Sequence, residues 1–141
     1  MITYLLSLTA LFLLTYDLLS IAGNCMLINR AGEKWWKGII PFYNDYTLFK
    51  IYWNKCYFPY YLLSYIIYTI ASYQKPSLFV NIIYFVFMAI ALAFSIISLD
   101  KIRIAYGKGQ WYTIGLAVLY PIFSIYLAAR CELQLPIKED I

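Results

Sequence analysis

The sequence predicts an all-α integral membrane protein, a single transmembrane domain over residues 1–141 that forms a bundle of about four transmembrane helices. Two observations lead to this fold class. Hydrophobic residues make up 64% of the chain and charged residues 13%, whereas soluble domains average about 45–50% and about 25%. The apolar residues also fall into long runs with few charges. A soluble domain of this size exposes much of its surface and could not cover so many apolar side chains, so we expect lipid to surround them.

Four apolar runs reach or approach the length that crosses a bilayer, which is about 20 residues with a range of about 17–25. We expect spans at about 3–28, 57–73, 78–99 and 111–129. The second and third runs contain no charged residue. The turn at 74–77 contains a proline and is short enough to join two antiparallel helices.

The first span carries polar side chains on one helical face. It lacks the basic N-terminal region and the small-residue cleavage site of a secretory signal, so we expect a retained helix. Asp17, Ser20 and Asn24 follow one another at spacings of three and four residues, which places them on the same face. A carboxylate inside a membrane helix is costly and indicates a functional site. The alternatives are that Asp17 is protonated, or that it pairs with a tyrosine of a neighbouring helix.

The loops predict an orientation. Eight of the eleven basic residues lie in the segments 30–56 and 100–110, which four spans would place on one side of the membrane. They are Arg30, Lys34, Lys37, Lys50, Lys55, Lys101, Arg103 and Lys108. Basic loops favour the cytoplasmic side. We therefore expect a multi-pass protein of the cell membrane with both segments in the cytoplasm and both termini outside.

The segment between the first two spans begins with a pair of tryptophans among basic residues. Trp35 and Trp36 have Lys34 and Lys37 on either side. This arrangement is typical of a segment held at a membrane surface by anionic headgroups and inserted rings.

A helix is expected to follow near 39–54. Pro41 suits the first turn of this helix. Tyr43 follows it, and Asn44 and Asp45 are expected to cap a turn. The apolar stretch is too short and too interrupted to cross a bilayer. The sequence therefore predicts an interfacial or re-entrant helix against the bundle.

Tyrosines of the second span share one helical face with two serines, at spacings of three and four residues. This face consists of Tyr57, Tyr61, Ser64, Tyr65, Tyr68 and Ser72. A phenol in apolar surroundings requires a hydrogen-bond partner, so we expect the face to point into the bundle or toward a partner protein. Packing is the simpler interpretation, and a polar permeation path is the alternative.

Two sequence blocks occur in a characteristic order. The first is A-G-x-x-x-W-x-x-x-I-P-x-Y-N-x-Y-x-L-x-x-I over residues 31–51, and the second is Y-G-K-G at 106–109, followed by Gly115 and Pro121. Together they resemble a family of small multi-pass bacterial membrane proteins of unknown function, some of whose relatives adjoin signal peptidase domains. The resemblance implies a multi-pass membrane fold and membrane localisation, and it implies no reaction.

Residues that carry catalysis are scarce. The chain has no histidine, the commonest general base and metal ligand. Cys25, Cys56 and Cys131 are isolated and lack the spacing of a zinc or dithiol site. The glycine turn at 106–109 lacks the spacing of a phosphate-binding loop. We therefore expect no enzymatic activity, no metal and no cofactor.

Three functional classes remain. The leading hypothesis is an accessory or interaction protein that recognises another membrane protein or a peptide, such as an immunity protein or a subunit of a complex. The alternatives are a small oligomeric channel or transporter, and a protein that binds anionic lipid headgroups. The bilayer is the expected environment in each case, and no nucleic acid partner is expected. The candidate binding residues are Asp17, Asn24, Trp35, Trp36, Pro41, Tyr43, Asn44, Asp45, Tyr61, Tyr65, Tyr68 and Lys108.

Overall fold

The computed structural model describes residues 2–134, with side chains from Ser7 onward. The protein is all-α and 80% helical, and these residues include no β-strand, which confirms the predicted secondary-structure class. The α-helices are α1 (Ile2–Arg30), α2 (Tyr43–Tyr52), α3 (Phe58–Ser72), α4 (Leu78–Ala105), α5 (Trp111–Val118) and α6 (Tyr120–Arg130). Two short 3₁₀ helices, η1 (Trp35–Gly38) and η2 (Lys55–Tyr57), flank α2.

Two helices in the described part of the chain are long and apolar enough to cross a membrane. They are α1, from Ser7 to Arg30, and α4, from Leu78 to Ala105. The helix α4 runs six residues past the expected end at 99. The helix α3 has 15 residues and is therefore about 22 Å long, less than the roughly 30 Å of a bilayer core. Helices of spanning length thus account for two of the four expected spans.

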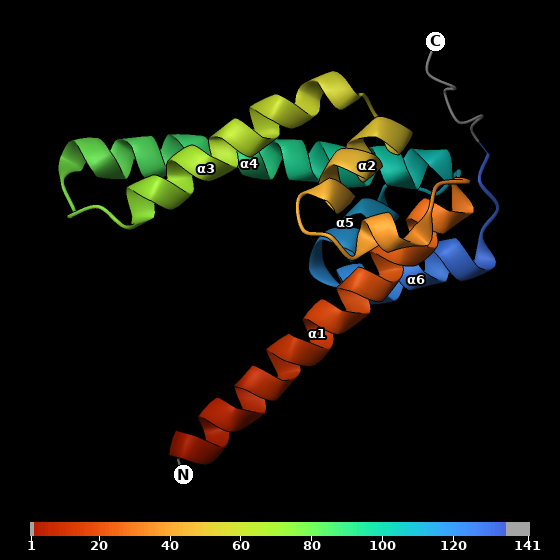
Figure 1. Ribbon diagram of the computed structural model, residues 1–141, viewed down its shortest axis with the longest axis horizontal. Helices are drawn as coiled ribbons and strands as arrows, with labels where there is room; N and C mark the ends of the chain where they lie inside the picture. Colours follow the sequence, from red (N-terminus) through yellow and green to blue (C-terminus); the bar gives the residue numbers. More distant parts are fainter. Residues whose placement is uncertain (1, 135–141) are drawn as a thin grey trace.

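The helices project from one packed region (Figure 1). The helix α1 runs out of this region toward its N-terminus, and the hairpin of α3 and α4 runs out in another direction. We call the packed region the hub; it comprises residues 20–57 and 95–134. We call residues 7–19 of α1 the arm. Every arm side chain is exposed except Tyr16, which is half-buried.

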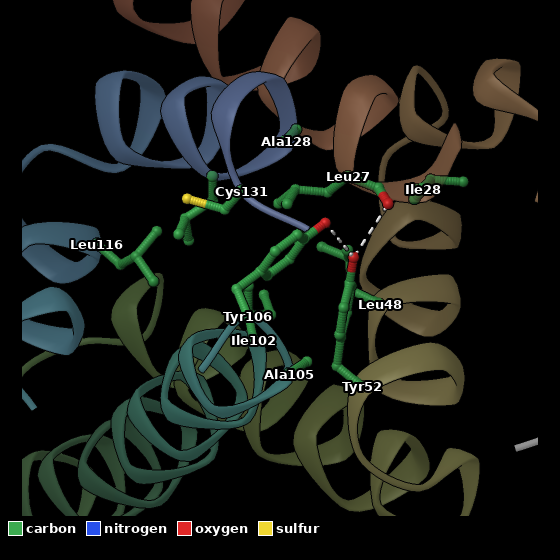
Figure 2. Close-up of a cluster of buried hydrophobic side chains, with 11 residues drawn as sticks. Leu27, Ile28, Leu48, Tyr52, Ile102, Ala105, Tyr106, Leu116, Ala128 and Cys131 are labelled. Carbon is green, nitrogen blue, oxygen red and sulfur yellow. Dashed lines mark hydrogen bonds between the residues drawn. The ribbon is translucent and has the colours of Figure 1, made fainter. Parts of the chain in front are cut away.

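Buried side chains from α1, α2, α4, α5 and α6 form the core of the hub (Figure 2). The hydroxyl of Tyr52 donates to the carbonyl of Leu27 at 3.0 Å and lies 3.2 Å from the hydroxyl of Tyr106. A phenol has one proton, which Tyr52 gives to Leu27, so Tyr106 is the donor in the second bond. These two bonds satisfy the polar atoms that the tyrosines bring into the core.

A glycine turn ends α4. Gly107 has φ +62°, a conformation that glycine adopts at little cost. The amide of Lys108 donates to the carbonyl of Arg103 at 3.1 Å, and the amide of Gly107 donates to the carbonyl of Ile104 at 2.9 Å. This pair of bonds is a Schellman cap. The Arg103 guanidinium adds a bond of 2.8 Å to the Lys108 carbonyl.

The expected single helix over 111–129 is wrong, because the chain breaks at Leu119 and reverses. Residues 112 and 123 of one continuous helix would lie about 16 Å apart along its axis, yet the rings of Tyr112 and Phe123 are 5.6 Å apart. Pro121 lies in the first turn of α6. Its ring lacks an amide proton and would clash with the carbonyl four residues earlier in a continuous helix.

The reversal returns the end of the chain to the hub. The amide of Gln134 donates to the carbonyl of Ala105 at 2.8 Å. The expectation that the segment after 129 emerges at the opposite end from the 100–110 loop is therefore wrong for the part that the structure describes. The rest of the expected external tail, 135–141, lies outside the described residues.

The helix predicted near 39–54 is α2, and it begins later than expected. Phe42 precedes it with φ +61°, and no side chain caps its first turn. Pro41 lies before the helix, where its carbonyl accepts from the amide of Tyr43 at 2.7 Å. Asn44 and Asp45 lie within the first turn. The predictions that Pro41 starts the helix and that these two residues cap a turn are therefore wrong, because the turn at 41–42 places the first helical residue at Tyr43.

Candidate functional site

Polar side chains from five helices, four of them in the hub and the fifth α3, line one cavity of about 150 Å³, which we call the hub cavity. An engineered apolar cavity of roughly this volume accommodates benzene, so the space suits several water molecules or one small ligand. The polar lining residues are Asn24, Asp45, Tyr61, Ser95, Ser98 and Tyr120. The apolar ones are Leu48, Phe49, Leu99 and Ile102. The cavity thus gathers polar groups that lie far apart in the chain.

Helical spacing explains how α4 contributes to the cavity. Ser95, Ser98, Leu99 and Ile102 recur at three- and four-residue intervals, so one face of α4 lines the wall. The hydroxyl of Ser95 donates to the carbonyl of Ala91 at 3.0 Å. Its proton is therefore used within the helix, and its oxygen remains able to accept a further hydrogen bond.

A close contact between α1 and α6 closes another side. A Cβ added at Gly23 would lie 2.1 Å from Ser124 Oγ, so only glycine permits this approach. The neighbouring Asn24 is 7% exposed, and its Oδ1 accepts a hydrogen bond from the hydroxyl of Tyr120. The Tyr120 proton is thereby used, as is that of Ser95.

Among the described residues, Asp45 is the one charged residue that lines the cavity. Its side chain is half-buried, and it forms no ion pair within residues 7–134. Burial raises the pKa of its carboxyl above the ordinary value. Its charge acts on the hydroxyls of Tyr61 and Tyr120. Beside it, the side-chain oxygen of Asn44 is buried and has no hydrogen-bond partner in the part of the chain that the structure describes.

Asp17, the other carboxylate that the sequence singles out, lies in the arm and not in the cavity. It is exposed, and the described residues include no ion-pair partner for it. Its neighbours Leu13, Leu14 and Leu18 are between 58% and 61% exposed. The arm is thus apolar around its circumference with one carboxylate. Such a helix requires lipid or another protein around it.

The tyrosine face of α3 packs largely on itself and on α4. The rings of Tyr65 and Tyr68 are 5.1 Å apart in an edge-to-face arrangement, and those of Tyr68 and Tyr84 are 6.1 Å apart. Ser64 is buried. Of the tyrosines predicted as binding residues, Tyr61 lines the cavity. These ring contacts favour packing over a permeation path for the rest of the face.

The tryptophan-rich loop forms a separate surface. Trp36 stacks on Tyr43 with ring centroids 6.2 Å apart, and Lys37 Nζ lies 5.9 Å from the Tyr43 centroid. Lys37 also pairs with Glu33 at 2.5 Å, and this hydrogen bond lowers the pKa of Glu33. Trp35 is exposed.

Two further predicted residues lie outside the cavity. Pro41 is exposed. The ammonium of Lys108 lies 5.8 Å from the Tyr112 ring centroid.

The structure therefore brings three predicted residues, Asn24, Asp45 and Tyr61, into one cavity, and the other predicted residues do not line it. It also adds residues that sequence reasoning missed. The signal for Ser95 and Ser98 was their helical spacing in an otherwise apolar run. Tyr120 gave no signal, because the sequence has 16 tyrosines and this one lies in an apolar run beside a proline.

Comparison with known proteins gives no significant match to a family model, to a curated protein or to a solved structure. The resemblance to small multi-pass membrane proteins stays a prediction.

Proposed function

We propose that this chain is a non-enzymatic integral membrane protein that recognises another membrane protein through the arm of α1. The basic segments of the hub, 30–56 and 100–110, would lie at the cytoplasmic face, with α1 and α4 crossing the bilayer. The spanning length of these helices supports this arrangement, and so does the distribution of basic residues. The arm has no basic residue, whereas the eight basic residues of 30–56 and 100–110 all belong to the hub.

The observation that carries the proposal is the exposed carboxylate of Asp17 on an unpacked apolar helix. Asp17 lies 13 residues before Arg30, which is about 20 Å along the helix axis, so it would sit inside the roughly 30 Å core of the bilayer. A carboxylate at that depth is costly unless it is neutralised or paired. A partner helix with a lysine or arginine at the same depth would supply the complementary charge.

The other functional classes draw less support from the geometry. A channel would require the polar groups of α1 to line one path, yet Asp17 is exposed whereas Asn24 is buried in the hub. Headgroup binding draws less support because two lysines of the 30–56 segment already pair with Glu33. The Nζ–Oε distances are 2.5 Å for Lys37 and 3.4 Å for Lys50.

Synthetic transmembrane helices test the proposal before the natural partner is identified. The purified chain is reconstituted in liposomes with a polyleucine helix that carries one central lysine, and association is measured by energy transfer. We expect association with the lysine helix, weak association with an all-leucine helix, and at least a tenfold loss with Asp17→Asn. Thr15→Val is the matched control, because the Thr15 hydroxyl already bonds the Phe12 carbonyl at 2.8 Å.

Equal association of both synthetic helices would contradict the proposal. So would an unchanged affinity in Asp17→Asn. Self-association of the chain that depends on Asp17 and occurs without any added helix would also overturn it, because the partner would then be a second copy.

A further inference from the structure

We propose that the hub cavity is a binding site for a small organic cation, a primary or methylated ammonium. The proposal is independent of the partner recognised by the arm. It stands on three properties of the lining: a carboxylate without an ion pair among the described residues, two hydroxyls whose protons are already used within the protein, and aromatic walls.

The carboxylate supplies the charge complementarity. Asp45 lines the cavity, and no cation among residues 7–134 forms an ion pair with it. A half-buried carboxylate without a partner is costly. A cation in the cavity would remove that cost.

Two of the four hydroxyl protons of the lining are already used in hydrogen bonds within the protein. Ser95 donates to the carbonyl of Ala91, and Tyr120 donates to Asn24 Oδ1. The oxygens of Ser95 and Tyr120 keep lone pairs, and hydroxyl oxygens can accept as well as donate. Two of the four hydroxyls in the lining can therefore offer a ligand only an acceptor, beside the carboxylate. A lining of this kind favours a ligand that donates hydrogen bonds or carries positive charge.

Aromatic and aliphatic side chains select the form of the cation. Phe49, Tyr61 and Tyr120 line the cavity, and the rings of Phe49 and Tyr61 stack with centroids 5.4 Å apart. Ring faces attract cations within about 6 Å. The remaining wall of Leu48, Leu99 and Ile102 suits methyl or methylene groups and offers nothing to the hydration shell of an inorganic ion. A volume of about 150 Å³ suits a ligand of roughly the size of benzene.

Titration calorimetry on the purified full-length chain in detergent tests this assignment. Methylammonium and tetramethylammonium chloride are the probes, sodium and potassium chloride at equal ionic strength are the ionic controls, and tert-butanol is the neutral control of similar size. We expect saturable binding of at least one ammonium and no saturable binding of the three controls.

Three variants locate the binding. Asp45→Asn should weaken ammonium binding at least tenfold, and Phe49→Leu should weaken it several-fold. Glu33→Gln removes the same charge outside the cavity and should leave the affinity unchanged. If Asp45→Asn does not fold, as judged by circular dichroism, Phe49→Leu and Glu33→Gln decide the question.

Equal binding of sodium or potassium would overturn the proposal in favour of an inorganic-cation site. Equal binding of tert-butanol, or no saturable binding of either ammonium, would show a cavity that holds only water or apolar solutes. Asp17→Asn should bind ammonium normally, so failure of this site and failure of the arm are separable.

Discussion

At the residue scale, the hydroxyls of Tyr52 and Tyr106 have different hydrogen-bonding roles, because each phenol has one proton to donate (Figure 2). The Tyr52 hydroxyl donates to Leu27 and accepts from Tyr106, whereas the Tyr106 hydroxyl only donates in these two bonds. The carbonyl of Leu27 has a second donor, the amide of Ala31 at 3.2 Å. Removal of the Tyr52 hydroxyl therefore leaves the Tyr106 hydroxyl as the one stranded group.

Tyr52→Phe should reduce the free energy of unfolding by about 1–3 kcal/mol, the cost of a buried polar group without a partner. Tyr106→Phe should cost about 0.5–1.5 kcal/mol, since it removes one hydrogen bond and strands nothing. Denaturant unfolding in detergent micelles compares the two. A greater cost for Tyr106→Phe would show that the proton order is reversed.

The buried carboxyl of Asp45 should make the stability of the hub depend on pH. Its pKa in the folded chain is raised above the ordinary 3.8, so the folded chain holds this proton more tightly than the unfolded chain does. The stabilisation is therefore complete below about pH 4 and is lost as the pH rises through the folded-state pKa.

Thermal unfolding from pH 4 upward in the wild-type chain and in Asp45→Asn measures the effect. The difference between the two chains should change across this window, with the wild type losing stability relative to the variant as pH rises. Glu33 titrates in the opposite sense and is common to both chains. A pH-independent difference would show that Asp45 is not desolvated in the fold.

The contact of α1 with α6 belongs to the scale of elements. Gly23→Ala would place a methyl group 2.1 Å from Ser124 Oγ and 3.0 Å from its Cβ. Overpacking of this kind costs typically about 1–3 kcal/mol, and Ser124→Ala should recover part of it by removing the nearer atom. Gly109→Ala is the control, because its added methyl group would meet no atom within 4 Å.

Unfolding midpoints in detergent measure these variants. If Gly23→Ala and Gly109→Ala were equally stable, the two helices would not approach as closely as described.

The elements differ in how far the sequence predicts them. Apolar runs suffice for α1 and α4, because length and composition alone define a helix of spanning length. The break between α5 and α6 is not predictable in this way, since membrane helices often tolerate a proline such as Pro121. The packing of Phe123 against Gly115 becomes visible only once the chain has reversed.

The cavity was predictable only in part, for a related reason. Asn24 and Asp45 stand out because a polar side chain near an apolar run requires an explanation. Ser95 does not, because its hydroxyl is satisfied by its own helix. Which polar residues share a cavity depends on the crossing of α1, α4 and α6, and helical periodicity carries no information about crossings.

At the scale of the whole molecule, the reversal of α6 combined with the proposed membrane arrangement predicts which labels share a side of the membrane. In a background without the native cysteines, Gly109→Cys and Gln134→Cys should react with a membrane-impermeant thiol reagent from the same side. Ser77→Cys, at the far end of the α3–α4 hairpin, should react from the other side. Gln134 labelled from the side of Ser77 would restore a continuous last span and refute the reversal.

The bond between Tyr120 and Asn24 joins residues 96 positions apart in the chain, and this separation has a consequence for biosynthesis. A ribosome adds about 5–20 residues per second, so α1 exists for roughly 5–20 s before α6 has been made. A helix satisfies its own backbone in lipid and can wait there, but Gly23 and Asn24 stay uncovered throughout. On the proposed function, the hub half of α1 is therefore as open to foreign helices during synthesis as the arm is afterwards, and the nascent chain has a second, temporary opportunity to associate with a partner.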